Sequence, residues 1–199
     1  MRDIIVATGN SGKLREIREI LHDLPYTLSS LADRWNPVPS IPETGDTFLA
    51  NARQKAAWVF ERTGIWTIAD DSGLEVDSLG GAPGVKSARY AGNNGDSRAN
   101  NEKLLRELSS TPEGQRTARF KCVVVFMTSS DAFYCAEGAC RGRIINTPRG
   151  TEGFGYDPLF VPDGFDRTFA ELPSADKHAI SHRGKALEQL RRYLDELDS

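Results

Sequence analysis

The chain has 199 residues, of which 39% are hydrophobic and 27% are charged, and its formal net charge is −3. This length is typical of one globular domain with a sizeable core, so we expect a single domain over residues 1–199. The mild acidity argues against a dedicated nucleic-acid-binding protein, which usually carries a strongly basic face. The longest apolar stretch, Cys122–Met127, has the length of a strand and cannot span a membrane. We therefore expect neither nucleic acid nor a membrane among the partners.

Hydrophobic periodicity predicts strands and helices that alternate in the first half of the chain. In chain order we expect a strand at residues 4–8, a helix at 13–21, a Pro-rich stretch at 37–42, a helix at 47–62, a strand at 65–70, a short strand and a long loop from residue 73, a helix at 100–108, a hairpin of strands at 119–128 and 133–145, and a terminal helix at 181–197. This order predicts an α/β fold in which helices pack around a mixed sheet.

The cysteines Cys122, Cys135 and Cys140 form no C-x-x-C pair. They lie in or beside apolar segments, which favours buried reduced thiols and the cytoplasm. The N-terminal apolar run, Ile4–Ala7, is too short for the core of a signal peptide. We therefore expect a cytoplasmic protein.

The turn after the first predicted strand, TGNSGK at Thr8–Lys13, looks like a phosphate-binding loop. A Walker loop needs a glycine five positions before Gly12 and a Ser or Thr after Lys13, but Ala7 and Leu14 occupy these positions. The turn can still attract an anion, because the first amides of the following helix and the Lys13 ammonium are both positive. From this stretch alone, an ordinary capped turn between strand and helix remains the alternative.

Two adjacent carboxylates, Asp70 and Asp71, stand where the strand at 65–70 is expected to end, and Ser72 follows them. Ligand sites in α/β sheets usually lie at such strand ends. Adjacent carboxylates repel each other, and Mg²⁺ bound together with substrate phosphates would relieve that repulsion. Glu43 is a third candidate for the metal site. The alternatives are a solvated turn for the aspartate pair and a helix cap for Glu43.

The segment GTEGFGYDPLF at residues 150–160 suggests recognition of a nucleobase. Phe154 and Tyr156 flank Gly155 there, and an exposed ring could stack on a flat heterocycle. A core turn with both rings buried is the alternative.

A second segment, ADKHAISHRGKAL, gathers basic side chains at the start of the terminal helix: Lys177, His178, His182, Arg183 and Lys185. The two histidines have the i, i+4 spacing of a zinc pair, but the H-E-x-x-H acid and a third ligand are missing. Positive residues at a helix start oppose the helix dipole. A basic recognition cluster is therefore a better interpretation than a solvated helix end.

Five segments occur in order along the chain: TGNSGKLREI, ETGDTFLANARQKA, ADDSGLEVDSLGGAPGVKSARYAG, GFGYDPLF and AISHRGKAL. Together they closely resemble the non-canonical purine nucleoside triphosphate pyrophosphatases, also called the inosine triphosphatase or dITP/XTP pyrophosphatase family. The resemblance implies a two-lobed α/β fold with a central mixed sheet flanked by helices and an active-site cleft between the lobes. It also implies hydrolysis of ITP, dITP and XTP to the monophosphate and pyrophosphate, with Mg²⁺ as cofactor and a homodimer as the assembly.

The resemblance assigns roles to residues of this chain. Asp71 resembles the general base and a metal ligand, Glu43 resembles a second metal ligand, and Ser72 resembles a substrate contact. The residues that resemble the triphosphate loop are Thr8, Gly9, Asn10, Ser11, Gly12 and Lys13. Those that resemble the nucleobase contacts are Phe154, Gly155, Tyr156, Asp157, Lys177, His182 and Arg183.

The chain departs from the family pattern at Ser11, where Pro is common, and at Lys86, where an aromatic residue is common and a dimer contact could be altered. Two other hypotheses stay open. One is a relative that cleaves pyrimidine or modified nucleotides, and the other is a nucleotide-binding module without activity. The paired acids at positions 70 and 71 weigh against the module, although the sequence does not decide which of the two is the main base.

Overall fold

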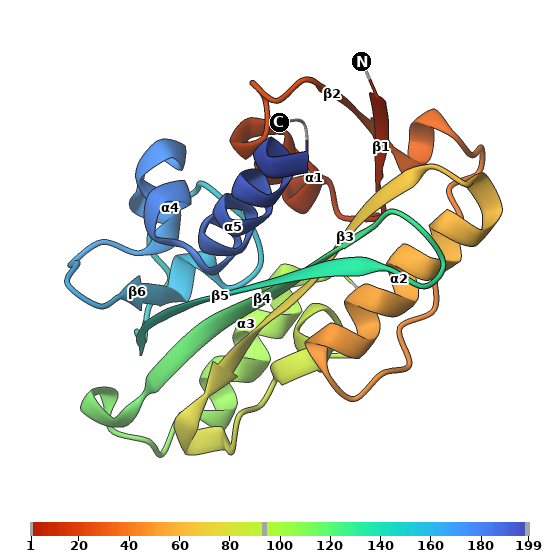
Figure 1. The fold of residues 1–199 in the computed structure, drawn as a ribbon. Helices are drawn as coiled ribbons and strands as arrows, with labels where there is room; N and C mark the ends of the chain where they lie inside the picture. Colours follow the sequence, from red (N-terminus) through yellow and green to blue (C-terminus); the bar gives the residue numbers. More distant parts are fainter. Residues whose placement is uncertain (1, 93–94, 198–199) are drawn as a thin grey trace. The chain divides into compact units, whose positions relative to one another are not determined.

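The computed structural model describes residues 2–92 and 95–197, and Figure 1 traces the elements along them. Within them the strands are β1 (Arg2–Val6), β2 (Tyr26–Ser30), β3 (Trp66–Val76), β4 (Thr117–Met127), β5 (Phe133–Ile144) and β6 (Phe160–Pro162), and the α-helices are α1 (Ser11–Ile20), α2 (Phe48–Thr63), α3 (Ser97–Glu107), α4 (Ser174–Ile180) and α5 (His182–Leu197). The sheet order is β2-β1-β3-β4-β5-β6. β1 runs parallel to β2 and to β3, whereas β5 and β6 are antiparallel. The predicted α/β fold with a mixed sheet is confirmed.

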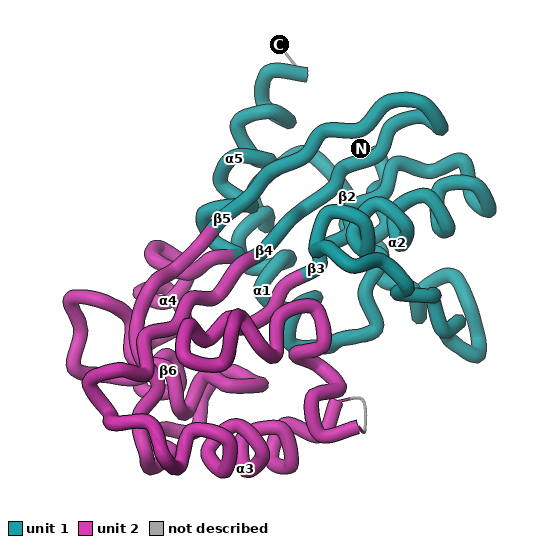
Figure 2. Tube along the Cα trace, turned by 90° about the horizontal axis from the view of Figure 1, so that it is seen from below, with its two compact units in different colours: residues 1–71, 122–138, 183–199 teal, residues 72–121, 139–182 magenta. Residues whose placement is uncertain are grey.

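The chain divides into two compact units, which Figure 2 distinguishes by colour. Unit 1 contains residues 1–71, 122–138 and 183–199, and unit 2 contains residues 72–121 and 139–182. Each unit has a hydrophobic core of its own. In unit 1 the apolar faces of α1 and α5 pack with β1 and β4, and in unit 2 α3 packs with the later parts of β3 and β5. The single domain over residues 1–199 stays a prediction.

The helix ends follow from residues that the sequence makes visible. Thr47 caps α2 by accepting a hydrogen bond from the amide of Ala50, and Gly64 ends the helix in the left-handed conformation with φ 65°. Thr is favoured at the start of a helix because its side-chain oxygen can accept a hydrogen bond from a free backbone amide. Gly is favoured just after the end because it adopts the left-handed conformation without strain. The predicted helix at residues 47–62 is therefore confirmed almost to its ends.

β3 differs most from the sequence-based expectation. It is one strand from Trp66 to Val76 and passes straight through Asp70 and Asp71, where we expected a strand end. Both aspartates are buried, with exposed fractions of 0% and 6%. The solvated turn that the sequence left open is therefore wrong, because the carboxylates stay inside the strand with charged partners. The sequence-based elements also omitted β2, β6 and α4.

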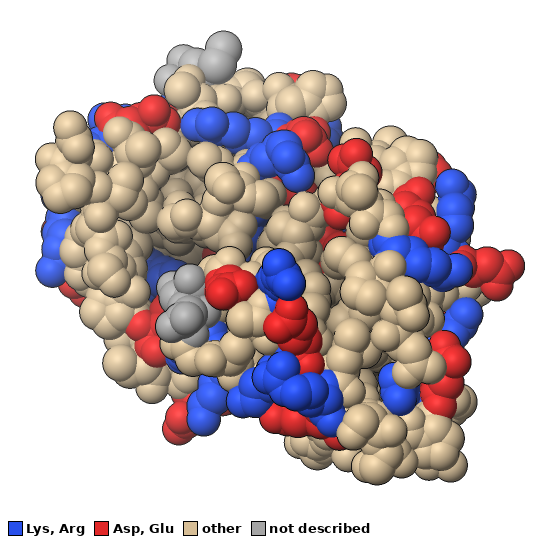
Figure 3. All heavy atoms as spheres, turned by 180° about the vertical axis from the view of Figure 1, so that it is seen from behind, with Lys and Arg blue, Asp and Glu red and all other residues tan. Residues whose placement is uncertain are grey.

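Basic and acidic side chains are interspersed on the face drawn in Figure 3. Several form ion pairs one helical turn apart, such as Arg98 with Glu102 at 2.9 Å and Arg192 with Glu188 at 3.3 Å. Exposed pairs of this kind contribute only about 0.3–0.5 kcal/mol each. In the described part of the chain, no helix reaches the combination of length and apolar content needed to cross a bilayer.

Candidate active site

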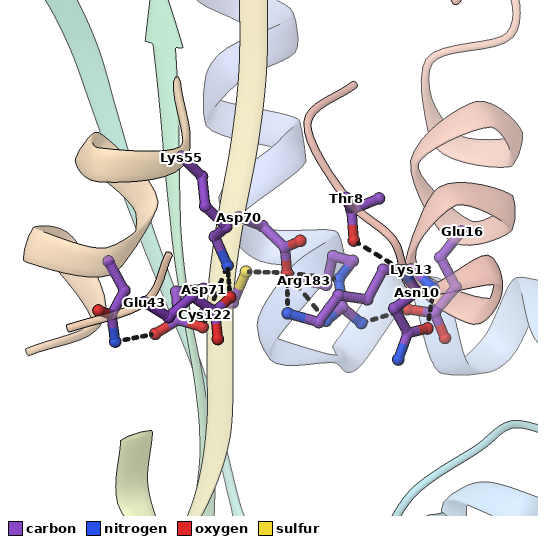
Figure 4. Close-up of polar contacts among 11 residues, drawn as sticks. Thr8, Asn10, Lys13, Glu16, Glu43, Lys55, Asp70, Asp71, Cys122 and Arg183 are labelled. Carbon is purple, nitrogen blue, oxygen red and sulfur yellow. Dashed lines mark hydrogen bonds and ion pairs between the residues drawn. The ribbon is translucent and has the colours of Figure 1, made fainter. Parts of the chain in front are cut away.

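The parallel pairing of β1 with β3 brings the candidate phosphate loop to the aspartates within unit 1. Val6 is in register with Ile68, and the amide of Ala7 donates to the carbonyl of Ile68 at 2.7 Å. The turn that follows β1 therefore runs beside the next residues of β3. As a result, the Nζ atom of Lys13 lies 3.1 Å from Oδ2 of Asp70 (Figure 4).

Side chains of the Thr8–Lys13 turn fix its shape. The amide of Asn10 donates to Oγ1 of Thr8 at 3.2 Å, and Oδ1 of Asn10 accepts from the amide of Lys13 at 3.0 Å. Asn10 is thus the N-cap of α1, which begins at Ser11 and has no acidic residue in its first turn. The capped turn and the anion site are compatible, because the first amides of a helix have no partner within the helix and carry a positive partial charge.

Asp70 is held by cations on one side of β3. Its Oδ2 lies 3.1 Å from Nζ of Lys13 and 3.1 Å from NH2 of Arg183, and NH1 of the same arginine lies 2.5 Å from Oε2 of Glu16. Burial by itself would raise the pKa of Asp70, but the nearby positive charges, Lys13 foremost, outweigh it and hold that pKa well below its usual range. Asp70 is therefore fixed as an anion.

Asp71 has a different set of partners, because successive side chains of a strand point to opposite faces. Nδ2 of Asn51 donates to its Oδ2 at 3.1 Å, and Nζ of Lys55 lies 3.4 Å from its Oδ1. Burial raises the pKa of Asp71 above its usual value and outweighs the opposing effect of Lys55. The two neighbouring carboxyl groups therefore differ in proton affinity.

Lys55 also joins Glu43 to this group, since its Nζ lies 2.6 Å from Oε1 of Glu43 (Figure 4). The helix cap that the sequence left open for Glu43 is wrong, because Thr47 caps α2. No group of three or more His, Cys, Asp or Glu side chains that could hold a metal is found in residues 2–92 and 95–197. Glu43 and Asp71 nevertheless fit Mg²⁺, which usually takes one or two protein carboxylates together with water and substrate phosphates.

Sequence reasoning missed Glu16, Asn51 and Lys55 as parts of this site. The three side chains are buried, with exposed fractions of 4%, 0% and 6%. Their signal is a polar residue on the apolar face of an amphipathic helix, since α2 buries Asn51 and Lys55 together with its apolar residues. A charged group at such a position needs a buried partner.

In unit 2, Asp157 organises the predicted nucleobase turn. Its Oδ2 accepts from the amide of Phe154 at 2.8 Å and from Nζ of Lys177 at 2.7 Å. The Lys177 ammonium also lies 5.2 Å from the centroid of the Phe154 ring. Gly153 is required here, because its φ is +76° and a Cβ would come within 2.1 Å of Oδ2 of Asp157. The structure therefore brings Phe154, Asp157 and Lys177 together, as the sequence predicted for one recognition site.

The side chains of Tyr156 and His182 are buried in the interior of unit 2. The Tyr156 hydroxyl donates to the carbonyl of Ser87 at 2.9 Å, and its ring is only 4% exposed. The His182 ring stacks on Phe120 with centroids 4.7 Å apart. For the Tyr156 ring, the core position that the sequence left open is the one observed. Phe154 is only half-buried.

Unit 2 also contains a cavity of about 620 Å³. Phe154 and Gly155 line it together with Asn101 and other residues of α3, and the Asn101 amide donates to the carbonyl of Gly155 at 3.0 Å. This volume is within the range of small-molecule sites. Lys177 and His182 are not among the described residues that line this cavity. The cavity therefore includes only some of the residues that the sequence predicted to contact the nucleobase.

Two further predicted site residues, Ser72 and Arg183, each follow a residue already described, but each belongs to the other unit. Ser72 follows Asp71 in β3 and is half-buried, although it falls in unit 2. Arg183 follows His182 in α5, but its guanidinium belongs to the buried ion pairs of unit 1. The histidine and arginine of the SHR motif are thus neighbours in the chain with separate side-chain partners.

A family model described as the Ham1 family matches residues 4–193. The chain belongs to the Ham1 family. The resemblance carried by the five sequence motifs is therefore confirmed, and it covers almost the whole chain. The Ham1 match includes every residue of the ion-paired group in unit 1 and every residue of the turn around Asp157.

Similar proteins come from several bacteria. A dITP/XTP pyrophosphatase of Geobacter sulfurreducens is 50% identical over 98% of this chain and 97% of its own length. A protein of the same name from Bacillus subtilis is 46% identical over 98% of each chain. Among solved structures, a HAM1 protein from Coxiella burnetii matches with a TM-score of 0.88 and 43% identity, over 98% of this chain and 100% of that one. The Staphylococcus aureus Ham1 protein matches with a TM-score of 0.85 and 37% identity, over 98% of this chain and 99% of that one. The fold and the Ham1 assignment therefore agree.

Proposed function

We propose that this chain is a nucleoside triphosphate pyrophosphatase that removes non-canonical purine nucleotides from the nucleotide pool. Its substrates would be dITP, XTP and ITP, and its products the nucleoside monophosphate and pyrophosphate. Relatives named dITP/XTP pyrophosphatase at 46% and 50% identity support this substrate class. The structural observation that carries the proposal is the pair Asp70 and Asp71, two adjacent buried carboxylates, of which Asp70 is paired with Lys13 and Asp71 with Lys55.

We infer different roles for the two carboxyl groups from their different partners and from the opposite directions of their pKa shifts. Asp70 stays ionised and fixes the Lys13 ammonium at 3.1 Å, so it serves as a structural anion. Asp71 has the raised pKa, and a carboxylate with a higher pKa accepts a proton more readily. We therefore assign to Asp71 the role of the general base, which would take a proton from the water that attacks the α-phosphorus.

Lys13 and the start of α1 would bind the phosphates that leave as pyrophosphate. The Lys13 side chain is 13% exposed, so its ammonium remains accessible while Asp70 holds it in place. The amides of the first turn of α1 add a positive end to the same turn. When the bond from the α-phosphorus to the bridging oxygen breaks, this group of donors would stabilise the negative charge on the leaving pyrophosphate.

Glu43 and Asp71 would hold Mg²⁺, which supplies charge neutralisation at the phosphate oxygens when bound. Lys55 lies between these two carboxylates at 2.6 Å and 3.4 Å and balances their charge. Burial by itself would lower the pKa of Lys55, but the negative charges of Asp71, Asp70 and Glu43 outweigh it and raise that pKa, so the ammonium stays protonated.

For the nucleobase, we propose that Phe154 supplies a stacking surface and that Lys177 and Asp157 orient the turn that carries it. The hydrogen bonds to Asp157, at 2.8 Å from the amide of Phe154 and 2.7 Å from Nζ of Lys177, fix the conformation of this turn. Stacking accepts any base, so the choice between hypoxanthine and adenine needs directed donors. We assign this choice to the SHR segment with His182 and Arg183. We also propose a homodimer, on the family resemblance, and a cytoplasmic location, which the reduced state of Cys122, Cys135 and Cys140 supports.

The test is a panel of nucleoside triphosphates incubated with the protein and Mg²⁺, with pyrophosphate and nucleoside monophosphate measured separately. We expect release of pyrophosphate from dITP, XTP and ITP at rates far above those for dATP, dGTP and pyrimidine nucleotides. Release of orthophosphate with a nucleoside diphosphate would contradict the reaction. Tight binding without turnover would favour the binding module, and preference for a pyrimidine nucleotide would favour the other hydrolase.

A further inference from the structure

We propose that Asn51 is a positioning residue for this reaction, because its side-chain amide orients the Asp71 carboxylate and ties it to the loop that carries Glu43. The inference rests on the proposed function, in which Asp71 is the base. Asn51 lies near the start of α2 and is fully buried, with an exposed fraction of 0%. A buried amide has to satisfy its donors and its acceptor inside the protein.

Both ends of the Asn51 amide have directed partners. Its Oδ1 accepts from the amide of Gly45 at 2.8 Å, and its Nδ2 donates to Oδ2 of Asp71 at 3.1 Å. A backbone N–H can only donate and an ionised carboxylate can only accept. The orientation of the Asn51 amide is therefore determined by its neighbours. A flipped amide would place its N–H donor against the amide of Gly45 and its oxygen against the carboxylate of Asp71.

The two oxygens of Asp71 are held by two different side chains of α2. Lys55 is 3.4 Å from Oδ1, and Asn51 is 3.1 Å from Oδ2. Residues four apart in a helix lie on one face, so both reach the same carboxylate. An ammonium attracts an anion with little directional preference, whereas a planar amide N–H requires alignment. Asn51 thus sets the rotation of the carboxylate, while Lys55 balances its charge.

The loop at residues 43–45 is pressed against the same face of α2. A Cβ on Gly45 would lie 2.6 Å from Cβ of Ala50 and 2.9 Å from Oδ1 of Asn51, so only glycine fits this contact. Next to it, Nζ of Lys55 holds Glu43 at 2.6 Å. Asn51 therefore links the position of the Glu43 loop to that of Asp71 through one rigid amide, and a change at Asn51 should disturb both carboxylates together.

The experiment compares Asn51→Ala and Asn51→Asp with a matched control, Asn100→Ala. Asn100 is a buried asparagine of α3 that makes the same kind of contacts, accepting from the amide of Ala91 at 2.7 Å and donating to the carbonyl of Ala88 at 3.2 Å. It lies outside the proposed catalytic and binding residues. Asn51→Asp keeps an acceptor for Gly45 but replaces the donor to Asp71 with a second carboxyl oxygen, so it turns the orienting hydrogen bond into a repulsive contact.

We expect kcat for pyrophosphate release from dITP to fall about 10- to 100-fold in both Asn51 variants, because a small misplacement of a reacting group has a cost of this order. KM should change less than about threefold, since the phosphate and base contacts remain. Asn100→Ala should lose a similar amount of thermal stability and keep the wild-type kcat.

Equal kcat values in Asn51→Ala and Asn100→Ala would overturn the inference and leave Asn51 a structural residue. So would a normal kcat in Asn51→Asp, or failure of both Asn51 variants to fold, which would assign the residue to stability. A wild-type protein that releases no pyrophosphate from dITP would overturn the proposed function and this inference with it, whereas an active wild type with unaffected variants overturns the inference alone.

Discussion

Asp70 and Arg183 form a buried ion pair in unit 1, with 3.1 Å between Oδ2 and NH2, although they stand 113 positions apart in the chain. Their side chains are 0% and 2% exposed, and Glu16 completes the group from α1. A buried charge is stable only while it is paired, and removal of one partner leaves the other uncompensated. The pair therefore links β3 to α5 and makes both residues sensitive to substitution.

Asp70→Asn is expected to destabilise the protein by about 3–5 kcal/mol at neutral pH, because it leaves Lys13 and Arg183 without their shared anion. The folded state lowers the pKa of Asp70 below the ordinary value of 3.8, so its contribution is fully present above that value and is lost only as the pH falls through the lower, folded pKa. Thermal melts from neutral pH to below pH 3.8 should show a constant gap between variant and wild type that closes only at the acidic end. A gap that closes in the neutral range would contradict the ion-pair assignment.

Arg183→Lys is the substitution that tests base selection, because Arg183→Ala would leave the buried carboxylates of Asp70 and Glu16 without the guanidinium that pairs with both. The lysine keeps one positive charge but cannot serve both carboxylates and a base with directed N–H groups. We expect the ratio of kcat/KM for dITP over dATP to narrow about tenfold or more, the effect of one charged hydrogen bond of 1.5–3 kcal/mol. If the variant loses activity equally on both nucleotides, Arg183 has no part in base selection and only supports the fold.

Sequence reasoning placed most elements of this fold, because each has a local signal. Thr47 and Gly64 mark the ends of α2, and the polar residues between two apolar runs mark the turn joining β4 and β5. β6 has only three residues, which is too short to give a periodic pattern. β3 was divided in the prediction because two adjacent carboxylates look like the end of a strand when their partners are unknown.

The candidate site was predictable only in part, for a related reason. The sequence identified Lys13 and Asp71 through their motifs, but it gave no indication that Lys55 lies between Asp71 and Glu43. Such contacts depend on how α2 packs beside β3, and packing between distant segments leaves no local pattern. Likewise, Arg183 looks like a recognition residue in a basic segment, and only the structure pairs it with Asp70.

The oligomeric state remains a prediction that light scattering can test. We expect a mass about twice the 21.9 kDa of one chain at micromolar concentration. The sequence resemblance implies an aromatic residue at the position of Lys86, so Lys86→Tyr is the informative variant if the wild type is monomeric. A monomer in both proteins would remove the homodimer from the proposal.

Asp71→Asn is expected to reduce kcat for dITP by about 100-fold or more while the protein stays folded, since a positioned base typically contributes this much. The variant removes the proton acceptor but keeps the size of the side chain. Because burial raises the pKa of Asp71, the ionised group is unfavourable in the folded state, and the neutral amide should not lower the melting temperature at neutral pH by a large amount. Turnover close to wild type at saturating Mg²⁺ would show that another group is the base.

Lys13→Ala is expected to weaken binding of the triphosphate much more than binding of the monophosphate product. The Lys13 ammonium lies at the start of α1, beside amides that favour anions, and the proposed reaction places the leaving pyrophosphate there. Asp70 keeps its ion pair with Arg183 in this variant, so the fold should be retained.

Calorimetry with dITP in an Asp71→Asn background prevents turnover, and the same background with dIMP provides the reference. We expect at least about a tenfold loss of affinity for dITP, the effect of one charge-assisted contact, and less than about a threefold loss for dIMP. Equal losses for the two ligands would place Lys13 outside the pyrophosphate-binding part of the site and would assign its ammonium to pairing with Asp70 alone.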